Sequence, residues 1–298
     1  MIISGNSSIN KVYYSGYTIS KIYACGGSLV WSYTPPVFDG KLYIHQTYDG
    51  AEYETTVPCD STSAVTSNDV RSGNINYRYT DRAIVGDCVT NIYTRAFYDC
   101  TSLTSVTLSD TVTTLSDGAF QGCDNLPSID LKNVTTIEAG AFSGCYSLTS
   151  ITIPDSVTSL GSAFGSCNGM TDVSVGSGVT TIPASCFSYC RSLSSITFTN
   201  SLTTIETRAF FVCENLINIE IPSSVTSIGD TAFYNCTRLS SFTIYATTPP
   251  TLGNNAFKKD TTILGYDLVI YVPDASVNAY QTAWSQYADK IKPISEKP

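Results

Sequence analysis

The most reactive side chains of this 298-residue chain are eleven cysteines and a single histidine, His45. A zinc site needs several Cys or His ligands at close spacing, and a nucleophilic triad needs a base such as histidine. The sequence has no Cys-x-x-Cys pair, and the pattern around His45 predicts a β-strand. We therefore expect no metal site, no cofactor and no histidine-based catalysis.

Seven of the cysteines recur at one phase of a repeat: Cys100, Cys123, Cys145, Cys167, Cys190, Cys213 and Cys236. Free cysteine behaves as a small apolar residue, so this spacing predicts a ladder of buried thiols rather than disulfides. Cys186 stands where other repeats carry alanine, which predicts another small buried site. Cys25, Cys59 and Cys88 lie outside the ladder, and the sequence leaves their pairing open.

Paired carboxylates are the second chemistry to consider. Glu138 and Glu206 fall at similar phases of the repeat, and glycoside hydrolysis uses two carboxyl groups about 5–10 Å apart. Three repeats separate them, which is roughly 15 Å at ~4.8 Å per coil. This separation is too large for the two groups to cooperate, so we expect the chain not to be an enzyme.

Large side chains at outward positions point to binding instead. Most variable positions of the repeat are small, whereas Arg95 and Tyr98 flank one core phenylalanine, and Arg208 and Phe211 hold the same phases five steps later. Exposed Tyr and Arg are typical of interface hot spots and of sugar-stacking surfaces, the alternative being that some cover seams between coils. Phe211 is the strongest candidate because Phe210 fills the core position. The full set is Phe211, Arg208, Tyr98, Arg95, Tyr146, Tyr189, Arg191 and Tyr234.

A repeated sequence motif, Ala-Phe-x-x-Cys-x-x-Leu, predicts the structural elements that position the candidate binding residues. Its phenylalanines are Phe97, Phe120, Phe142, Phe164, Phe187, Phe210, Phe233 and Phe257. They step by 23, 22, 22, 23, 23, 23 and 24 residues, and self-similarity at such a period indicates a solenoid of stacked coils. The fold class that this period predicts is a β-rich solenoid with short strands in each coil.

Each coil is expected to hold two short strands. Residues 148–154 alternate apolar and polar side chains, as a half-buried strand does, and residues 157–160 predict a second strand. The Ala-Phe-x-x-Cys passage then forms a turn or a short helical link. The residues expected to point inward in one coil are Leu103, Val106, Leu108, Val112, Leu115, Phe120 and Cys123.

The solenoid, residues 84–260, is expected to lie between caps. Residues 1–34 predict a small β module for anchoring and assembly. Residues 35–83 predict a β-rich N-terminal cap or linker domain, with strands at 41–44 and 51–57. Residues 261–298 predict a closing cap, with a strand at 267–273 and a helix at 274–288. In that helix Asp274 or Ser276 would be the N-cap, and one apolar face would cover the last coil. That face comprises Val277, Tyr280, Trp284 and Tyr287.

The composition excludes several kinds of partner. Charged residues make up 14% of the chain and the net charge is −9, which argues against nucleic acid because phosphate contacts need clustered Lys and Arg. No run of about 18 apolar residues is present, so we expect no membrane insertion. The first eight residues lack the basic start and apolar core of a secretory signal.

The repeat Leu-x-x-Ile-x-Ile-Pro-x-x-Val-x-x-Ile-x-x-x-Ala-Phe-x-x-Cys resembles the BspA-like (Treponema-type) leucine-rich repeats. Residues 216–239 match it most fully, and the resemblance covers about residues 84–260. It implies adhesion, and binding of proteins or glycans, by surface proteins of anaerobic, host-associated bacteria, and it carries no shared catalytic residues. Residues 270–284 are similar to the terminal segment that these proteins often have.

Residues 1–31 resemble a different kind of protein. Their Lys-Val-Tyr and Val-Trp motifs are similar to modules of phage structural and tail proteins, which implies a virion protein made in the host cytoplasm and anchored by its N-terminus. We expect a homo-oligomer that contacts other virion proteins through this module. The assembly residues expected are Val12, Tyr13, Ile22, Tyr23 and Trp31.

Several functions follow from these patterns. The first is a phage tail or virion-surface protein that attaches to a bacterial cell-surface glycan or protein. The alternatives are a bacterial surface adhesin and a purely structural virion component. A lattice binder is disfavoured, because the outward threonines do not form an unbroken row. Thr107, Thr152, Thr197 and Thr243 are interrupted by Asp130, Ser174 and Glu220.

Overall fold

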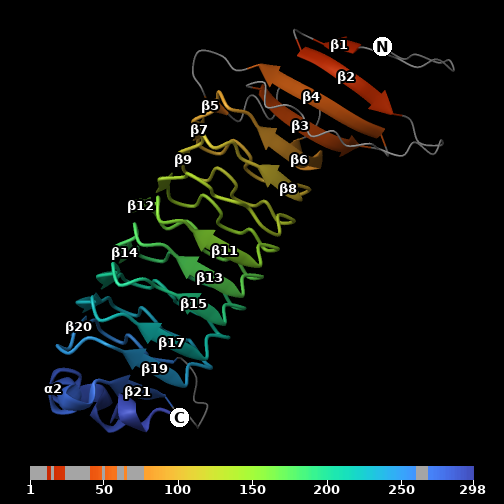
Figure 1. Ribbon diagram of the computed structural model, residues 1–298. Helices are drawn as coiled ribbons and strands as arrows, with labels where there is room; N and C mark the ends of the chain where they lie inside the picture. Colours follow the sequence, from red (N-terminus) through yellow and green to blue (C-terminus); the bar gives the residue numbers. More distant parts are fainter. Residues whose placement is uncertain are drawn as a thin grey trace.

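The chain forms an elongated stack of coils with a sheet at its N-terminal end and a helical cap at its C-terminal end (Figure 1). The computed structural model describes residues 78–259 and 268–298 with their side chains. It also describes the backbone of Tyr77 and of five earlier strands, β1 to β5. The stack confirms the solenoid predicted from the repeat.

The N-terminal sheet joins antiparallel strands to the first coils. Its order is β1-β2-β4-β3-β6-β8, antiparallel as far as β6 and parallel from β6 to β8. The strands are β1 (Val12–Tyr14), β2 (Tyr17–Tyr23), β3 (Lys41–Tyr48), β4 (Ala51–Pro58), β6 (Thr80–Val85) and β8 (Ser105–Thr107). The strands predicted at 41–44 and 51–57 are confirmed. Four expected assembly residues, Val12, Tyr13, Ile22 and Tyr23, lie in β1 and β2, and Trp31 lies outside the described residues.

A column of parallel strands forms one face of the solenoid. Ile151 lies opposite Val173, with alternate residues exposed and buried, and the equivalent pairing joins most neighbouring coils. The strands are β11 (Ser150–Ile153), β13 (Asp172–Val175), β15 (Ser195–Thr197), β17 (Asn218–Ile221), β19 (Ser241–Ile244), β21 (Val269–Val272) and β22 (Ile291–Pro293). The column consists of two sheets, β11-β13-β15 and β17-β19-β21-β22, since β15 and β17 are not paired. The sequence pattern predicted this column but missed β22, whose three residues are too few to show a period.

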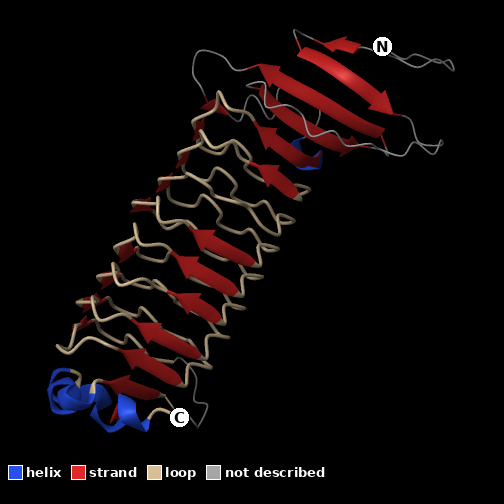
Figure 2. Cartoon of the chain, viewed as in Figure 1, coloured by secondary structure: helices blue, strands red, loops and turns tan. Residues whose placement is uncertain are grey.

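A second column of two-residue strands runs behind the first (Figure 2). Here too the pairing is parallel, as between Thr136 and Thr114. The strands are β5 (Ala64–Val65), β7 (Asn91–Ile92), β9 (Thr114–Leu115), β10 (Thr136–Ile137), β12 (Ser159–Leu160), β14 (Thr181–Ile182), β16 (Thr204–Ile205), β18 (Ser227–Ile228) and β20 (Thr251–Leu252). The two strands predicted for each coil are therefore confirmed in most coils.

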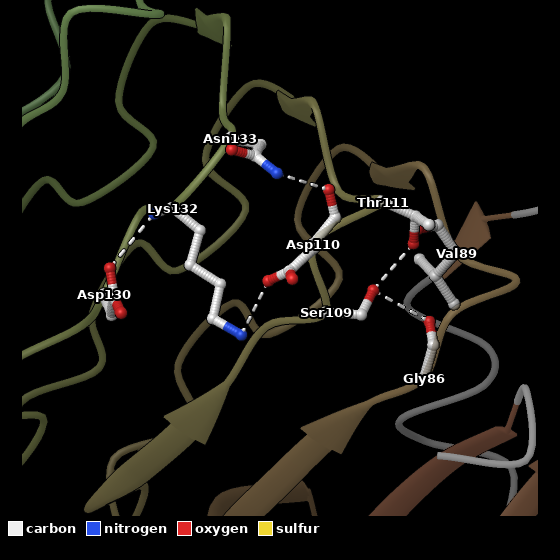
Figure 3. Close-up of polar contacts among 8 residues, drawn as sticks. All are labelled: Gly86, Val89, Ser109, Asp110, Thr111, Asp130, Lys132 and Asn133. Atoms are coloured by element: carbon white, nitrogen blue, oxygen red, sulfur yellow. Dashed lines mark hydrogen bonds and ion pairs between the residues drawn. The ribbon is translucent and has the colours of Figure 1, made fainter.

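The first strand column is interrupted at residues 126–131. Pro127 has no backbone N–H to donate to the preceding coil, and this coil is one of the two with a 22-residue step. The chain turns tightly instead: Lys132 has φ 41°, and its N–H donates to Asp130 at 3.1 Å. Side chains fix this turn to the coil before it, since Lys132 pairs with Asp110 at 3.0 Å and Asn133 donates to the Asp110 carbonyl at 3.0 Å (Figure 3).

The interior is a stack of like residues. The repeat phenylalanines lie ring over ring at centroid distances of 5.0–5.5 Å from Phe97 to Phe257. The seven ladder cysteines and Cys186 are free and buried, as predicted. Thiols donate to the phenylalanine carbonyl of the preceding coil, for example Cys145 to Phe120 at 3.2 Å. Burial raises the pKa of Cys145 to about 12, so this thiol is a poor nucleophile.

Among the cysteines outside the ladder, Cys88 is disulfide-bonded, and Cys25 and Cys59 lie outside the described residues. The sequence had left the state of Cys88 open. No helix of the described part of the chain is long and apolar enough to cross a membrane.

The C-terminal cap closes the last coil as predicted. Tyr280 and Trp284 are buried, and their polar atoms donate to the Ala246 and Pro250 carbonyls at 2.8 and 3.0 Å. Val277 and Tyr287 pack against the same core. The cap consists of η2 (Asp274–Ser276), α2 (Val277–Ala283), η3 (Ser285–Lys290) and η4 (Ile294–Glu296).

The predicted helix N-cap is wrong. No side-chain hydrogen bond caps α2. Ser276 donates its hydroxyl to the Thr247 carbonyl at 2.7 Å, and the Asp274 carboxylate accepts from the Ser295 N–H at 3.1 Å. Both side chains therefore bind segments distant in sequence, and α2 itself ends at Ala283 rather than continuing to 288.

Candidate binding surface

The Ala-Phe-x-x-Cys link is a turn that holds its outward residues in a fixed geometry. In nearly every coil the residue two before the core phenylalanine has a positive φ, and so does the residue two after it. Glycine occupies such positions in two coils, at Gly118, Gly122, Gly140 and Gly144. Elsewhere larger residues adopt the same backbone, which is costly for any side chain with a Cβ.

Two columns of outward residues result, and we call them together the turn face. The first column is the residue two before each core phenylalanine: Arg95, Gly118, Gly140, Ser162, Ser185, Arg208, Thr231 and Asn255. The second column is the residue directly after it: Tyr98, Gln121, Ser143, Gly165, Ser188, Phe211, Tyr234 and Lys258.

Three of the predicted aromatic residues meet on this face. The Phe211 ring stacks on Tyr234 at 5.2 Å with 8° between the planes, and its other neighbour, Tyr189, meets it edge-on at 5.4 Å. We call Tyr189, Phe211 and Tyr234 the aromatic ridge. Tyr189 is 42% exposed, whereas Phe211 and Tyr234 are half-buried against one another. The three rings thus contact one another across neighbouring coils and also present aromatic surface outward.

Two arginines accompany the ridge. The Arg208 guanidinium lies 5.6 Å from the Phe211 ring centre, and that of Arg191 lies 5.9 Å from the Tyr189 ring centre. Arg191 is also ion-paired with Glu214 at 2.5 Å. Arg208 forms no ion pair with any described carboxylate. Its charge is therefore available to an external anion, while that of Arg191 is partly neutralised.

The other predicted residues lie apart from the ridge. Arg95 covers the Tyr98 ring at 5.5 Å, in the same arrangement as Arg208 and Phe211. Tyr146 is the most exposed large aromatic of the described part, at 51%, and it has no ring contact with another described residue. The sequence placed Arg95 and Tyr98 at the same two phases as Arg208 and Phe211, and the structure shows that each arginine lies over its aromatic neighbour. That Tyr189 and Tyr234 contact Phe211 could not be read from the spacing.

The backbone of the turn face is already paired between coils. The Tyr189 N–H donates to the Phe211 carbonyl at 2.7 Å, and the Val212 N–H to the Tyr234 carbonyl at 2.8 Å. A ligand on this face would therefore meet side chains, because the peptide groups are satisfied by the next coil.

The two carboxylates considered for catalysis serve the coil junctions. Glu138 accepts a hydrogen bond from the Asp117 N–H at 2.9 Å, and Glu206 accepts one from the Ala184 N–H at 2.9 Å. Each thus satisfies a backbone donor of the preceding coil. Within the described ranges, no three His, Cys, Asp or Glu side chains gather as metal ligands would.

A polar cluster that the sequence did not reveal lies on the outer face of β17 and β19. Glu220 accepts from Lys297 at 2.6 Å and from the Tyr245 hydroxyl at 3.0 Å. The hydrogen bond from Lys297, and to a lesser extent that from Tyr245, lowers the pKa of Glu220. Burial, together with the neighbouring Glu220 carboxylate, raises the pKa of Tyr245. Thr243, expected to be outward and exposed, is buried beside Glu220. No local pattern links Lys297 to Glu220, which stands 77 positions earlier.

Comparisons with known proteins agree with this architecture. Residues 80–184 and 161–280 match the family model of the BspA type leucine rich repeat region, in 6 copies. No curated protein sequence is significantly similar to the chain.

Among solved structures, a leucine-rich repeat protein from Bacteroides ovatus ATCC 8483 is 26% identical over 72% of this chain, with a TM-score of 0.44. The match covers 66% of that protein, so this chain spans just under two thirds of its length. The T. pallidum leucine rich repeat protein is 28% identical over 54% of this chain and 84% of its own, with a TM-score of 0.47. A leucine rich cell surface protein from Faecalibacterium prausnitzii A2-165 is 22% identical over 92% and 73%, with a TM-score of 0.45.

Proposed function

We propose that this chain, which belongs to the BspA type leucine-rich repeat family, is a non-enzymatic attachment protein whose repeats bind a glycan or protein of a bacterial cell surface. The observation that carries the proposal is the aromatic ridge with Arg208 beside it. Stacked aromatic rings and an arginine without an ion pair are the residue types that dominate binding energy at interfaces.

The surroundings of the ridge support this assignment. In the two coils before Phe211, the second column carries only Gly165 and Ser188. The rings of Phe211 and Tyr234 are therefore the large side chains of this part of the second column. The rings hold one another in place through stacking, so a ligand that binds them need not order flexible side chains. Low ordering cost is one reason why aromatic residues serve as anchors.

We propose two places where the repeats are displayed, a virion or a bacterial surface. Display on a virion is favoured by the phage-like motifs of residues 1–31, with assembly of a homo-oligomer through β1 and β2. Display on a bacterial surface, as an adhesin, is favoured by the repeat family itself. The disulfide at Cys88 is compatible with both, since disulfides persist on virions and on cell surfaces. In a purely structural virion component, the ridge would contact other virion proteins.

The test is binding of the labelled, purified protein to a panel of anaerobic gut-type bacteria. We expect strain-selective binding that Phe211→Ser and Arg208→Ser weaken at least tenfold. The matched control is Lys258→Ser, in the same column two coils beyond Phe211 and with no part in the ridge. If no strain binds, or if both ridge variants bind as the unaltered protein does, attachment through this face is wrong.

A further inference from the structure

Two Arg–aromatic pairs occupy the same two phases of the turn face. Arg95 lies over Tyr98 at 5.5 Å, and Arg208 lies over Phe211 at 5.6 Å. Five coils separate them, and the intervening core rings are stacked at 5.0–5.5 Å per step. At a strand spacing of ~4.8 Å the two pairs stand roughly 25 Å apart along the solenoid axis.

The coils between the pairs carry short side chains. After Gln121, the second column continues with Ser143, Gly165 and Ser188. A Cβ placed on Gly165 would lie 3.6 Å from the Ser188 hydroxyl and 3.8 Å from that of Ser143, so the hydroxyls of neighbouring coils stand next to one another. Between the two pairs, the second column therefore has a stretch of short side chains, Ser143, Gly165 and Ser188, that leaves room for an extended ligand.

The two arginines also adopt an unfavourable backbone. Arg95 has φ 56° and Arg208 has φ 58°, whereas Gly118 and Gly140 hold the same position in two of the coils between them. Glycine would be the less strained choice at both sites. Ser185, Thr231 and Asn255 share this backbone, so the strain alone does not distinguish the two arginines, and it is their charge beside a ring that does.

We propose that the turn face binds one extended anionic glycan along the solenoid axis, with an Arg–aromatic pair at each end holding a sugar that bears a carboxylate. The inference rests on the proposed attachment function and specifies its ligand class. Neither guanidinium is ion-paired to a described carboxylate. Each is thus free to pair with an anion, and the adjacent ring can stack on the apolar face of a sugar.

A peptide suits this face less well than a glycan. An extended peptide gains most of its affinity by adding backbone hydrogen bonds to a sheet edge. Here the N–H groups of Gly140 and Gly144 already donate to the Ser162 and Gly165 carbonyls, at 3.0 and 2.9 Å. The Ser143 and Ser188 hydroxyls donate to the Gly165 and Ser185 carbonyls, at 3.2 and 2.9 Å, so they can offer a ligand their oxygens as acceptors. Acceptor oxygens and aromatic rings match the hydroxyls and apolar faces of sugars. The net charge of −9 opposes the approach of any anion, so an anionic glycan needs local cations such as the two arginines to bind.

Two separated pairs predict a dependence on ligand length. A short ligand reaches one pair only, whereas a long one engages both and gains from the high effective concentration of its second end. The probes are polygalacturonate, digalacturonate, neutral dextran and poly-L-glutamate, measured by isothermal titration calorimetry with the full chain. We expect polygalacturonate to bind at least tenfold more tightly per chain than digalacturonate, and the dextran and poly-L-glutamate at least tenfold more weakly than polygalacturonate.

The variants are Arg95→Gly and Arg208→Gly. Glycine holds this backbone position at Gly118 and Gly140, in two of the coils between the pairs, so both changes should preserve the fold. Either change should reduce polygalacturonate affinity about tenfold, to the level of one pair, and both together should abolish binding. Thr231→Gly is the matched control, since Thr231 shares the first column and a positive φ of 53° but lies beyond both pairs. It should bind as the unaltered chain does.

Each contrary result has a distinct meaning. Equal affinity for poly-L-glutamate and polygalacturonate would overturn the glycan assignment. If Arg95→Gly leaves the affinity for polygalacturonate unchanged, one ligand does not contact both Arg–aromatic pairs, and that part of the proposal is wrong. If bacterial cells bind through the ridge but no anionic glycan does, the glycan inference is wrong and the attachment function stands. If neither cells nor glycans bind, both are wrong.

Discussion

Phe210 and Phe211 are neighbours in sequence and lie on opposite sides of the same turn. Phe210 is fully buried between the rings of Phe187 and Phe233, at 5.5 and 5.2 Å. Phe211 stacks on Tyr234 at the surface and lies beside Arg208. The inner side of the turn therefore holds the coils together, and its outer side is free to vary without loss of the fold. This division explains how a uniform repeat can carry a local binding surface.

The largest expected effect separates these two neighbours. Phe210→Ala should lower the free energy of unfolding by about 3–5 kcal/mol, because it leaves a cavity in the ring stack. Phe211→Ala should cost less than about 1 kcal/mol, because its ring is only half-buried. Urea denaturation followed by circular dichroism measures both. Equal losses for the two variants would show that the inner and outer sides do not differ as described.

Cys145 and Tyr146 give a second pair of neighbours with the same contrast. Cys145→Ala should cost about 1–2 kcal/mol, since it removes buried sulfur and the thiol bond to the Phe120 carbonyl. Tyr146→Ala should change stability by no more than about 0.5 kcal/mol, because Tyr146 is 51% exposed. The same denaturation measurement applies, and a greater loss for Tyr146→Ala would contradict the assignment of its side chain to the outside.

A stabilising change should be found on the turn itself. Ser166 has φ 63°, and Gly144 holds the same phase one coil earlier. Ser166→Gly should raise the free energy of unfolding by up to about 1 kcal/mol, because relief of a strain of about 1–2 kcal/mol exceeds the entropic cost of glycine. Ser188→Gly is the control: Ser188 lacks a positive φ and donates to the Ser185 carbonyl, so it should destabilise. A loss in both variants would refute the strain argument.

The smallest effect concerns the outer face of the sheet and depends on pH. The bonds from Lys297 and Tyr245 hold the pKa of Glu220 below its usual 4.5. The pair therefore stabilises the fold above pH 4.5, and its contribution disappears as the pH falls through the lowered pKa. Because both side chains are partly exposed, the contribution should be a few tenths of a kcal/mol.

Glu220→Gln tests this pair. The variant should unfold at a slightly lower temperature than the unaltered chain at pH 7 and at the same temperature near pH 3. A constant difference across this range, measured by thermal denaturation, would show that Glu220 acts through packing rather than charge.

The sequence predicted much of the fold because the same pattern is repeated eight times. The ladder cysteines, the core phenylalanines and the closing face of Tyr280 and Trp284 were all identified from spacing alone, and all are buried. The errors fall where the pattern is interrupted or ends. Asp274 and Ser276 were expected to cap a helix and instead bind residues 295 and 247, because partners distant in the chain leave no trace in a local motif.

The candidate surface could be predicted only in part for the same reason. Spacing placed Arg208 two positions before Phe210 and Phe211 one after it, and so marked both as outward residues, but their contact came from the structure. Spacing also did not show that Tyr189, two positions after its own core ring, would reach Phe211 of the next coil at 5.4 Å. That contact depends on the left-handed backbone of Tyr189, at φ 61°, which directs its side chain toward the neighbouring coil.

By itself the sequence determined the period of the coils and the set of side chains that fill them, since burial of apolar groups at regular spacing requires no knowledge of distant contacts. The tertiary structure alone decided which outward side chains meet. It stacked Phe211 on Tyr234, brought Lys297 to Glu220, and placed Arg208 so that it pairs with no carboxylate of the described residues. These contacts join residues of different coils, and their geometry is set by the backbone of each turn and by the rise between coils.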